Sequence, residues 1–546
     1  MSFHNKVVYQ IYPKSFQDSN GDGWGDIRGV IDRLDYLADL GIDVIWFNPM
    51  TVSPQKDNGY DVTDYRRFDP RYGTMEDFEE LVKETKKRHI DIMFDMVFNH
   101  TSTTHEWFRK ALAGDAKYQD YYIFREGKAD GSAPNNWQSK FGGPAWVYVP
   151  SLKKWYLHLF DPTQADLNWA NPAVRQECAD IVNFWRSKGV KGFRFDVINE
   201  INKWSFEDDP NNFDGRQFYT DGPREEEYLK FLNENSFGQD PDHITVGEMS
   251  STTIEKCAKY AGKDSHELDM VFSFHHLKVD YKDGKKWELQ PFDFMELKKL
   301  LFSWQLGMQE QNAWNALFWN CHDQPRSVSR FGDDKKYRRE SAKMLATAIH
   351  LLRGTPYVYQ GEEIGMTNAG FTDIAQYRDV ESINFHDILL KEGKPEEEIL
   401  HILNERSRDN ARTPMQWNDM ENAGFTEGTP WLPVCSNYKA INAVSDRWDP
   451  DSIFNYYREL IRLRHSMEIV AEGEVKPLLE EHPDVFAYER TYSKESMIVV
   501  CNFFGRDTDV KLDVNGYELL LSNYRDSKLS SEIHLRPYES LVLYRK

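Results

Sequence analysis

Eight segments with the character of buried strands alternate with helical segments over the first two thirds of this 546-residue chain. The strand segments are rich in β-branched and aromatic residues, and most lack an internal proline. They cover residues 6–12, 43–48, 90–97, 191–196, 244–248, 269–274, 315–319 and 355–360. Eight such units favour a closed α/β barrel, the (β/α)8 or TIM barrel, over an open doubly wound sheet. No glycine-rich phosphate motif follows the first strand, which also disfavours a dinucleotide-binding fold.

Amphipathic segments lie between these strands. In residues 27–40 the apolar side chains recur at helical spacing, and Gly41 ends the run. The same periodicity predicts helices over residues 75–89, 172–188, 223–236, 293–308 and 337–353.

Three regions depart from the alternating pattern. Residues 101–170 are rich in Trp, Tyr, Gly and Asn and show little helical periodicity, which predicts a lid subdomain inserted at the barrel mouth. Residues 361–450 are loop-rich, and from about residue 470 short strands with turns replace helices. We therefore expect a barrel from residues 1–100 and 171–469, with a C-terminal all-β sandwich domain over 470–546.

Composition excludes several classes of protein. The net charge is −22 without a basic run, which argues against a nucleic-acid partner. Five cysteines without CxxC spacing indicate neither a disulfide framework nor a zinc site. The first residues enter a strand without a leader, and no apolar segment is long enough to span a bilayer. We expect a cytoplasmic monomer with no membrane partner.

Three acidic residues lie at or just after the ends of predicted strands, in the segments KGFRFDVIN (191–199), HITVGEM (243–249) and NALFWNCHD (315–323): Asp196, Glu248 and Asp323. Because the carboxyl ends of barrel strands converge on one mouth, these side chains are expected to share a pocket. Converging carboxyl groups suit glycosidic-bond cleavage, in which one acts as nucleophile and another as proton donor. A helix cap or a salt bridge would explain any one of them alone, but the three together favour catalysis.

Four short motifs contain these acids: DMVFNH (95–100), GFRFD (192–196), VGEM (246–249) and HDQPR (322–326). In this order at four strand ends they resemble the α-amylase family, glycoside hydrolase family 13, and the resemblance spans nearly the whole chain. It implies that Asp196 is the nucleophile, that Glu248 is the general acid and base, and that Asp323 stabilises the transition state. It also implies that His100 and His322 bind sugar hydroxyls. A retaining mechanism would place the first two carboxyl groups about 5–5.5 Å apart.

Neighbouring residues bear on the ionisation of these acids. Arg194 lies two residues before Asp196 and points to the same face of the strand, so its charge is expected to keep Asp196 ionised. Glu248 needs a raised pKa to act as an acid. One departure from the family is Cys321, where Asn usually precedes the His-Asp pair. Because Cys is a poorer hydrogen-bond partner, the expected support of His322 is weaker.

Two further motifs bear on the end of the sugar site, DNGYD (57–61) and RDNARTPMQW (408–417). Resemblance to the α-glucosidases of the family implies that Asp57, Tyr60 and Arg412 close the nonreducing end. Asp57 paired with Arg412 would grip the 4-hydroxyl of the sugar, and the closed end implies an exo-acting enzyme that removes one glucose. A buried structural ion pair is the alternative.

The loop DSNGDGWGD (18–26) presents oxygen ligands at near-alternate spacing between glycines, a pattern that suits structural Ca²⁺. Its candidates are Asp18, Asn20, Asp22 and Asp26, and related sequences imply that the carbonyl of Trp24 joins them. The loop begins like an EF-hand, but Gly29 stands at the twelfth position and no helix precedes it. A metal-free polar loop is the alternative, and no organic cofactor is expected.

Resemblance to the oligo-1,6-glucosidase-like subgroup narrows the substrate. The segments QADLNW (164–169), SKFGG (139–143), EMSSTT (248–253) and SFHHLKVDY (273–281) resemble members that act on a phosphorylated, α-(1,1)-linked disaccharide. Phosphate needs convergent N–H donors, and Lys278 and Lys286 follow the sixth strand. Solvated lysines are the alternative. Hydrolysis of isomalto-oligosaccharides, and sucrose isomerisation or transglycosylation, also stay open.

Overall fold

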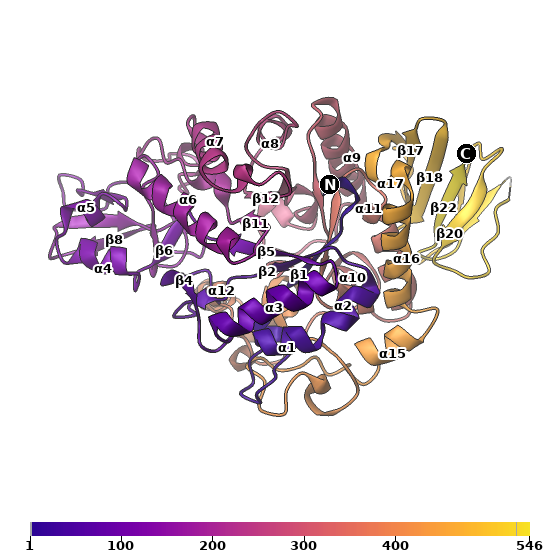
Figure 1. The fold of residues 1–546 in the computed structure, drawn as a ribbon, viewed down its shortest axis with the longest axis horizontal. Helices are drawn as coiled ribbons and strands as arrows, with labels where there is room; N and C mark the ends of the chain where they lie inside the picture. The colour runs from indigo at the N-terminus through magenta and orange to yellow at the C-terminus, as the bar shows by residue number, and fades with distance from the viewer. Residues whose placement is uncertain (1–2, 531) are drawn as a thin grey trace.

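A computed structural model describes residues 3–530 and 532–546. A central barrel carries a subdomain of short helices and strands on one side and a β-sheet domain at the C-terminal end on the other (Figure 1). None of the helices in these described ranges has the length and apolarity needed to cross a membrane.

The barrel consists of the eight predicted strands, all of which are present and parallel. Their order around the barrel is β13-β12-β11-β5-β2-β1-β15-β14, and a parallel bridge between Val271 and Asn315 joins the first strand to the last. The barrel is therefore closed. The strands are β1 (Val8–Ile11), β2 (Val44–Phe47), β5 (Asp91–Met96), β11 (Gly192–Phe195), β12 (Ile244–Met249), β13 (Met270–Ser273), β14 (Ala316–Leu317) and β15 (Thr355–Tyr359).

Helices surround the strands where the apolar periodicity predicted them. The run over residues 27–40 is the exception, because it breaks at Arg33 into two short helices. The helices of the barrel are α1 (Ile27–Asp32), α2 (Leu34–Leu40), α3 (Met75–Lys87), α6 (Pro172–Ser187), α7 (Glu225–Asn235), α8 (Ile254–Tyr260), α9 (Phe294–Glu310), α10 (Ser327–Phe331) and α11 (Arg338–His350).

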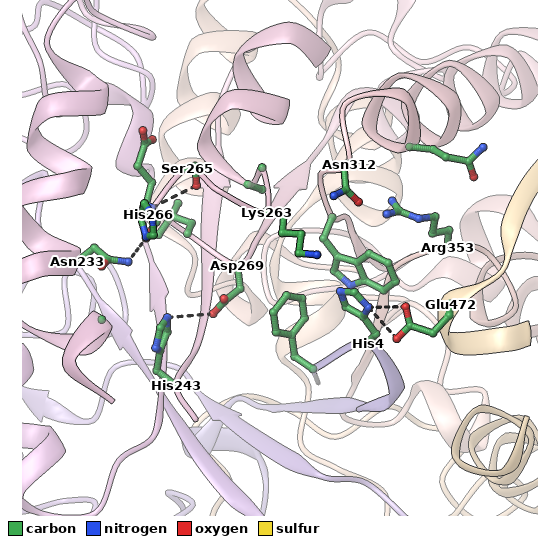
Figure 2. A pocket seen from close by; sticks show the side chains of 18 of the residues that line it. His4, Asn233, His243, Lys263, Ser265, His266, Asp269, Asn312, Arg353 and Glu472 are labelled. Atoms are coloured by element: carbon green, nitrogen blue, oxygen red, sulfur yellow. Dashed lines mark hydrogen bonds and ion pairs between the residues drawn. The ribbon is translucent and has the colours of Figure 1, made fainter. Parts of the chain in front are cut away.

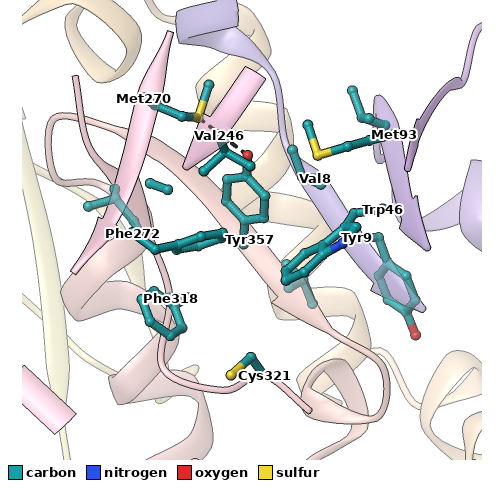
Figure 3. Packing of buried hydrophobic residues seen from close by; sticks show 14 of the residues in the cluster. Val8, Tyr9, Trp46, Met93, Val246, Met270, Phe272, Phe318, Cys321 and Tyr357 are labelled. Carbon is teal, nitrogen blue, oxygen red and sulfur yellow. Dashed lines mark hydrogen bonds between the residues drawn. The ribbon is translucent and has the colours of Figure 1, made fainter. Parts of the chain in front are cut away.

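Large side chains fill the barrel interior (Figure 3). The ring of Phe272 lies edge-on to Tyr357 and Phe318, with centroids 4.6 and 4.8 Å apart, and 5.7 Å from Trp46. Such edge-to-face contacts add to the burial of apolar area. The centre of the barrel is thus a packed core, and open space for a ligand lies at its ends.

The segment after β5 forms the predicted subdomain beside the mouth. Strand β6 (His100–Ser102) pairs antiparallel with β10 (Gln164–Asp166), which ties the two ends of the segment together. Between them lie α4 (Glu106–Leu112), α5 (Ala116–Gln119), β7 (Phe124–Arg125), β8 (Trp146–Val149) and β9 (Lys154–Leu157). Trp137, Trp146 and Leu157 form a small core there with Phe218 and Tyr219 from the loop after β11.

Residues 361–450 are more helical than the sequence indicated. They contain α12 (Val380–Lys391), α13 (Glu396–Arg406), α14 (Asp409–Arg412) and α15 (Ala443–Trp448). The stretch is loop-rich as predicted, but the sequence analysis did not predict these four helices. Asp379 caps α12 by accepting the backbone N–H groups of Glu381 and Ser382, a start signal that the sequence contains.

The chain ends in the predicted β-domain, which follows α16 (Ile453–Ser466) and α17 (Glu468–Glu472). An antiparallel sheet has the order β16-β17-β18-β22-β20, and β19 pairs with β21. Phe486 of this sheet stacks on Phe302 of α9 with centroids 4.8 Å apart, so the sheet packs against the barrel helices. The strands are β16 (Glu474–Leu478), β17 (Val485–Tyr492), β18 (Glu495–Asn502), β19 (Thr508–Val510), β20 (Glu518–Ser522), β21 (Ile533–Leu535) and β22 (Ser540–Arg545).

Candidate active site

The carboxyl ends of the barrel strands surround a cavity of about 280 Å³. This is slightly below the usual size of ligand pockets, about 300–1,000 Å³. Most of the predicted site residues line it: Asp57, Tyr60, His100, Asp196, Glu248, Lys278, Lys286 and Asp323. Residues that are distant in sequence therefore do meet in one pocket, as the strand ends predicted.

Arg194 joins three carboxyl groups beneath this cavity. Its Nη1 donates to Asp95 Oδ1 at 2.7 Å and to Asp196 Oδ1 at 2.6 Å, and its Nη2 donates to Glu248 Oε2. Only 2% of the Arg194 side chain is exposed. One buried guanidinium thus fixes the orientation of both acids that the sequence predicted to be catalytic.

Burial sets the ionisation of these two acids. It raises the pKa of Asp196 to about 7 and the pKa of Glu248 to about 8. Arg194 lowers both pKa values, but by less than burial raises them. Arg194 therefore favours the ionised form of Asp196, as expected, but burial outweighs its effect on the pKa. A hydrogen bond between the two carboxyl groups raises the pKa of Glu248 and lowers that of Asp196, so Glu248 is the better proton donor.

The surroundings of Asp323 lower its pKa, whereas those of Asp196 and Glu248 raise their pKa values. Burial raises its pKa, but His322, Arg408 and Arg412 together hold it well below the usual range. His322 Nε2 lies 3.0 Å from Asp323 Oδ2. Burial lowers the pKa of His322 to about 4, so the ring is neutral, and Gln10 Nε2 donates to its Nδ1 at 2.9 Å. That bond assigns the remaining proton to Nε2, which faces Asp323.

Cys321 has little to do with the support of His322. The imidazole is held by Gln10 and by the parallel ring of Tyr60, with centroids 5.1 Å apart and an interplanar angle of 4°. The Cys321 sulfur accepts the backbone N–H of Asp323 at 3.4 Å. The Cys321 side chain belongs to the buried cluster that also contains Trp46 and Phe318 (Figure 3).

The predicted pair of Asp57 and Arg412 does not form. Arg408 Nη2 donates to Asp57 Oδ1 at 3.1 Å, whereas Arg412 Nη2 donates to Asp323 Oδ1 at 2.9 Å. Both arginines flank the short helix α14, and Arg408 also lies 3.2 Å from Asp323 Oδ1. Arg408 therefore takes the place that the sequence assigned to Arg412. Burial raises the pKa of Asp57 to about 7 despite both arginines.

Tyr60 and His100 line the same wall. Tyr60 Oη donates to Asp95 Oδ2 at 2.8 Å. His100 Nε2 lies 3.0 Å from the carbonyl oxygen of Tyr60, and burial lowers the pKa of His100 to about 4. Gln164 Nε2 donates to Asp57 Oδ2 at 3.0 Å. The wall is thus a hydrogen-bonded network around a neutral imidazole.

The two predicted phosphate-binding lysines differ. Lys286 donates to Glu381 Oε2 at 2.5 Å, so its charge is already compensated. Lys278 forms no ion pair with any residue that the structure describes. Although Lys278 is exposed at the mouth, desolvation by the walls, then the charges of Arg216 and Lys140, lower its pKa to about 8. Of the two lysines, Lys278 is therefore the one whose charge no described acidic residue compensates.

Several residues of the site were not predicted from the sequence, among them Asp95, Lys140, Gln164 and Arg408. Asp95 opens the DMVFNH motif and lies one residue before the end of β5, so its place near a strand end could have indicated it. The other three lie on loops and in the inserted subdomain. No periodicity links such positions to a strand end.

In the candidate calcium loop, the carboxyl groups of Asp18 and Asp26 accept hydrogen bonds from nearby backbone N–H groups. Asp18 accepts backbone N–H groups of Asn20, Gly21 and Gly23 at 2.8–2.9 Å, and the side chain of Asp26 caps α1 through Gly29. Among the described residues, no three His, Cys, Asp or Glu side chains are grouped to hold a metal ion. Asn20, Asp22 and the carbonyl of Trp24 lie on the same loop, and calcium binding there stays a prediction.

Comparison with known proteins places the chain in a class. Residues 10–473 match the family described as Alpha amylase, catalytic domain, and residues 485–542 match the Alpha-amylase SusG C-terminal domain. The chain belongs to the α-amylase family of glycoside hydrolases.

Particular relatives narrow this class. The chain is 52% identical over 543 residues to trehalose-6-phosphate hydrolase of Bacillus subtilis (strain 168), covering 98% of this chain and 97% of the relative. It superposes with a TM-score of 0.97 on a crystal structure of a mutant Bacillus licheniformis trehalose-6-phosphate hydrolase in complex with PNG, at 53% identity over the whole of both chains. Oligo-1,6-glucosidase of Halalkalibacterium halodurans is 47% identical over 98% of this chain and 97% of the relative.

Proposed function

We propose that this enzyme hydrolyses trehalose 6-phosphate to glucose and glucose 6-phosphate. The observation that carries the proposal is Lys278, an uncompensated cation in the same cavity as Asp196 and Glu248. A phosphate monoester is nearly doubly charged at neutral pH and binds such a cation with charge-assisted hydrogen bonds. The likeness to trehalose-6-phosphate hydrolases over the whole chain supports the same substrate.

The reaction proceeds by double displacement with retention. The Asp196 carboxylate attacks the anomeric carbon of the unphosphorylated glucose while Glu248 donates its proton to the glycosidic oxygen, and glucose 6-phosphate leaves. Glu248, now ionised, removes a proton from water, which attacks the same carbon and releases glucose and the Asp196 carboxylate. The higher pKa of Glu248 suits this division of roles.

The surrounding groups stabilise positive charge on the sugar ring. Asp323 stays ionised because His322, Arg408 and Arg412 lower its pKa, so it offers a fixed negative charge to the oxocarbenium-like transition state. The Asp57–Arg408 pair closes the far end of the cavity and offers hydrogen bonds to the last sugar hydroxyls. This closed end supports exo-action.

The site also bears on location. We propose that the enzyme works in the cytoplasm, where its five buried and unpaired cysteines would stay reduced and where a charged sugar phosphate would be retained.

Hydrolysis of isomalto-oligosaccharides is the second candidate, favoured by the likeness to oligo-1,6-glucosidase. Measuring kcat/KM for trehalose 6-phosphate, isomaltose and sucrose in parallel separates the candidates. We expect trehalose 6-phosphate to exceed the neutral sugars by about 100-fold, the contribution of charge-assisted hydrogen bonds to phosphate. Faster cleavage of isomaltose, or release of an isomerised sucrose product, would replace the proposal.

Lys278 offers a second test. Lys278→Met should reduce kcat/KM for trehalose 6-phosphate by about 10–100-fold and leave a neutral aryl α-glucoside far less affected. Lys285→Met is the matched control, because Lys285 is exposed and pairs with Glu288 outside the cavity. Equal losses on both substrates would contradict the phosphate role of Lys278.

A further inference from the structure

Lys140 is a second cation at the mouth, and it comes from the inserted subdomain rather than from the barrel. It lines the cavity together with Lys278. Its Nζ donates to Glu200 Oε1 and, at 3.3 Å, to Ser250 Oγ. Glu200 follows the nucleophile Asp196 by four residues, and Ser250 follows the acid Glu248 by two. Lys140 is therefore anchored to both catalytic strand ends.

The hydrogen bonds of Lys140 leave part of the ammonium group available. An ammonium has three N–H donors, and Glu200 and Ser250 accept two of them. About 23% of the Lys140 side chain is exposed, whereas the Glu200 side chain is fully buried. Glu200, the acidic partner, thus lies inside the protein, and the third N–H of the Lys140 ammonium has access to the mouth.

The contacts of Lys140 place it near the general acid. Ser250, which accepts from Lys140, lies two residues after Glu248, just beyond the end of β12. Glu248 protonates the leaving oxygen in the proposed reaction, so Lys140 is well placed for a charged group on the leaving sugar. The next residue, Phe141, packs against Arg408 with the guanidinium 5.0 Å from the ring centroid, so the same loop also contacts the Asp57–Arg408 pair.

Lys140 and Lys278 also lie close enough to repel each other. The charges of Arg216 and Lys140 contribute to the lowered pKa of Lys278. Neighbouring cations at a cavity wall cost free energy when the cavity holds only water, and an anion between them removes that cost. Lys286 is paired with Glu381, as Lys140 is with Glu200, but Lys286 is not among the charges that lower the pKa of Lys278.

We propose that Lys140 is a specificity-determining residue that binds the phosphate of the substrate together with Lys278. This inference rests on the proposed function. Lys278 supplies an ammonium group with no ion-pair partner among the described residues, whereas Lys140 supplies one whose position Glu200 and Ser250 fix. The inserted subdomain thereby contributes directly to the choice of a phosphorylated over a neutral leaving group.

The test is the ratio of kcat/KM for trehalose 6-phosphate to kcat/KM for p-nitrophenyl α-glucoside. In Lys140→Met this ratio should fall about 10–100-fold relative to the wild type, the loss expected for one charge-assisted hydrogen bond. Lys140→Arg, which keeps the charge, should recover part of it. Lys285→Met is the control and should leave the ratio within twofold.

A double-mutant cycle sharpens the test. If both lysines bind one phosphate, the two substitutions should not act independently. The fold-change of the ratio in the double variant (Lys140→Met with Lys278→Met) should then differ from the product of the fold-changes in the two single variants. Competitive inhibition by glucose 6-phosphate should weaken in Lys140→Met more than inhibition by glucose.

Two outcomes overturn the inference and differ from each other. If Lys140→Met loses activity equally on both substrates, or keeps the wild-type ratio, Lys140 only anchors the subdomain and this inference fails alone. If the wild type itself shows no preference for the phosphorylated substrate, the proposed function fails, and the inference fails with it. Circular dichroism and the thermal midpoint of each variant separate misfolding from either outcome.

Discussion

The two ends of the barrel each hold a polar cavity, and the charged groups are arranged differently in the two. The cavity at the base is the larger, about 600 Å³ against about 280 Å³ at the mouth. Its walls include residues that precede barrel strands: His243 and Asp269, which Figure 2 shows, and Trp314. Volume alone would therefore select the wrong end.

Charge arrangement explains the difference. At the base the ionisable groups pair two by two near solvent: His243 Nε2 lies 3.5 Å from Asp269 Oδ2, and His4 Nδ1 lies 3.0 Å from Glu472 Oε2 (Figure 2). At the mouth a single buried guanidinium, Arg194, holds three carboxyl groups. Burial also raises the pKa of Asp269 at the base, and that of Glu267 to about 8. The two ends therefore differ in the guanidinium that joins several carboxyl groups at the mouth, not in raised pKa values alone.

The largest effect should come from the nucleophile. Asp196→Asn keeps the shape of the side chain but removes the carboxylate that attacks carbon, so kcat should fall by about 10⁴-fold or more. Steady-state hydrolysis of trehalose 6-phosphate measures it, with circular dichroism as the control for folding. Loss of less than 10-fold would place the nucleophile elsewhere.

Next is the proton donor. Glu248→Gln should lower kcat for trehalose 6-phosphate by about 10²–10⁴-fold, the usual contribution of general acid catalysis. Formation of the intermediate from p-nitrophenyl α-glucoside should suffer much less, because nitrophenolate leaves without a proton. Burst kinetics compare the two substrates. An equal loss of the first step on both would contradict the role of Glu248 as acid.

The pH profile of kcat/KM should be bell-shaped. Asp196 must be ionised, so activity is lost as pH falls through its pKa of about 7. Glu248 must be protonated, so activity is lost as pH rises through its pKa of about 8. The two limbs belong to the interacting pair. A neutral aryl glucoside avoids titration of the substrate phosphate, and a profile that stays flat from pH 5 to 10 would refute the assignment.

A smaller effect concerns the predicted calcium loop. A chelator should lower the thermal midpoint by about 5 °C or less, because binding to the native state alone stabilises by roughly 3 kcal/mol at a hundredfold excess over Kd. Asp22→Ala should remove the response to added Ca²⁺, and Asp32→Ala, an exposed acid outside the loop, is the control. A midpoint independent of metal and chelator would leave a metal-free loop.

The smallest effect should come from the base of the barrel. Lys263 lines the larger cavity and is exposed there. Lys263→Met should change kcat/KM for trehalose 6-phosphate by less than about twofold, because surface substitutions away from a site have little effect. A loss of 10-fold or more would show that the two ends are coupled and would break the comparison.

The sequence predicted the parts of this site that depend on periodicity. Strand ends placed Asp196, Glu248 and Asp323 together because parallel strands share a direction. It could not decide between Arg408 and Arg412 as the partner of Asp57. These residues lie four apart around one short helix, so both face the mouth, and only packing selects one.

The burial of the site residues, and its effect on their pKa values, could not be predicted from the sequence either. The sequence shows a guanidinium two residues from Asp196, but not the desolvation that outweighs it and raises the pKa of Asp196. Nor does it show that Glu381, far along the chain in α12, neutralises Lys286. Such contacts depend on long loops, whose paths follow from tertiary packing rather than from local pattern.

The most direct test of the account is mass spectrometry of the Glu248→Gln variant after reaction with a fluorinated α-glucosyl fluoride, an activated substrate whose intermediate turns over slowly. Attack by the buried carboxylate held by Arg194 predicts one hexosyl adduct, on the peptide that contains Asp196. An adduct on a different acidic residue, or rapid release of the fluorinated sugar as its β-anomer with no adduct at all, would contradict it.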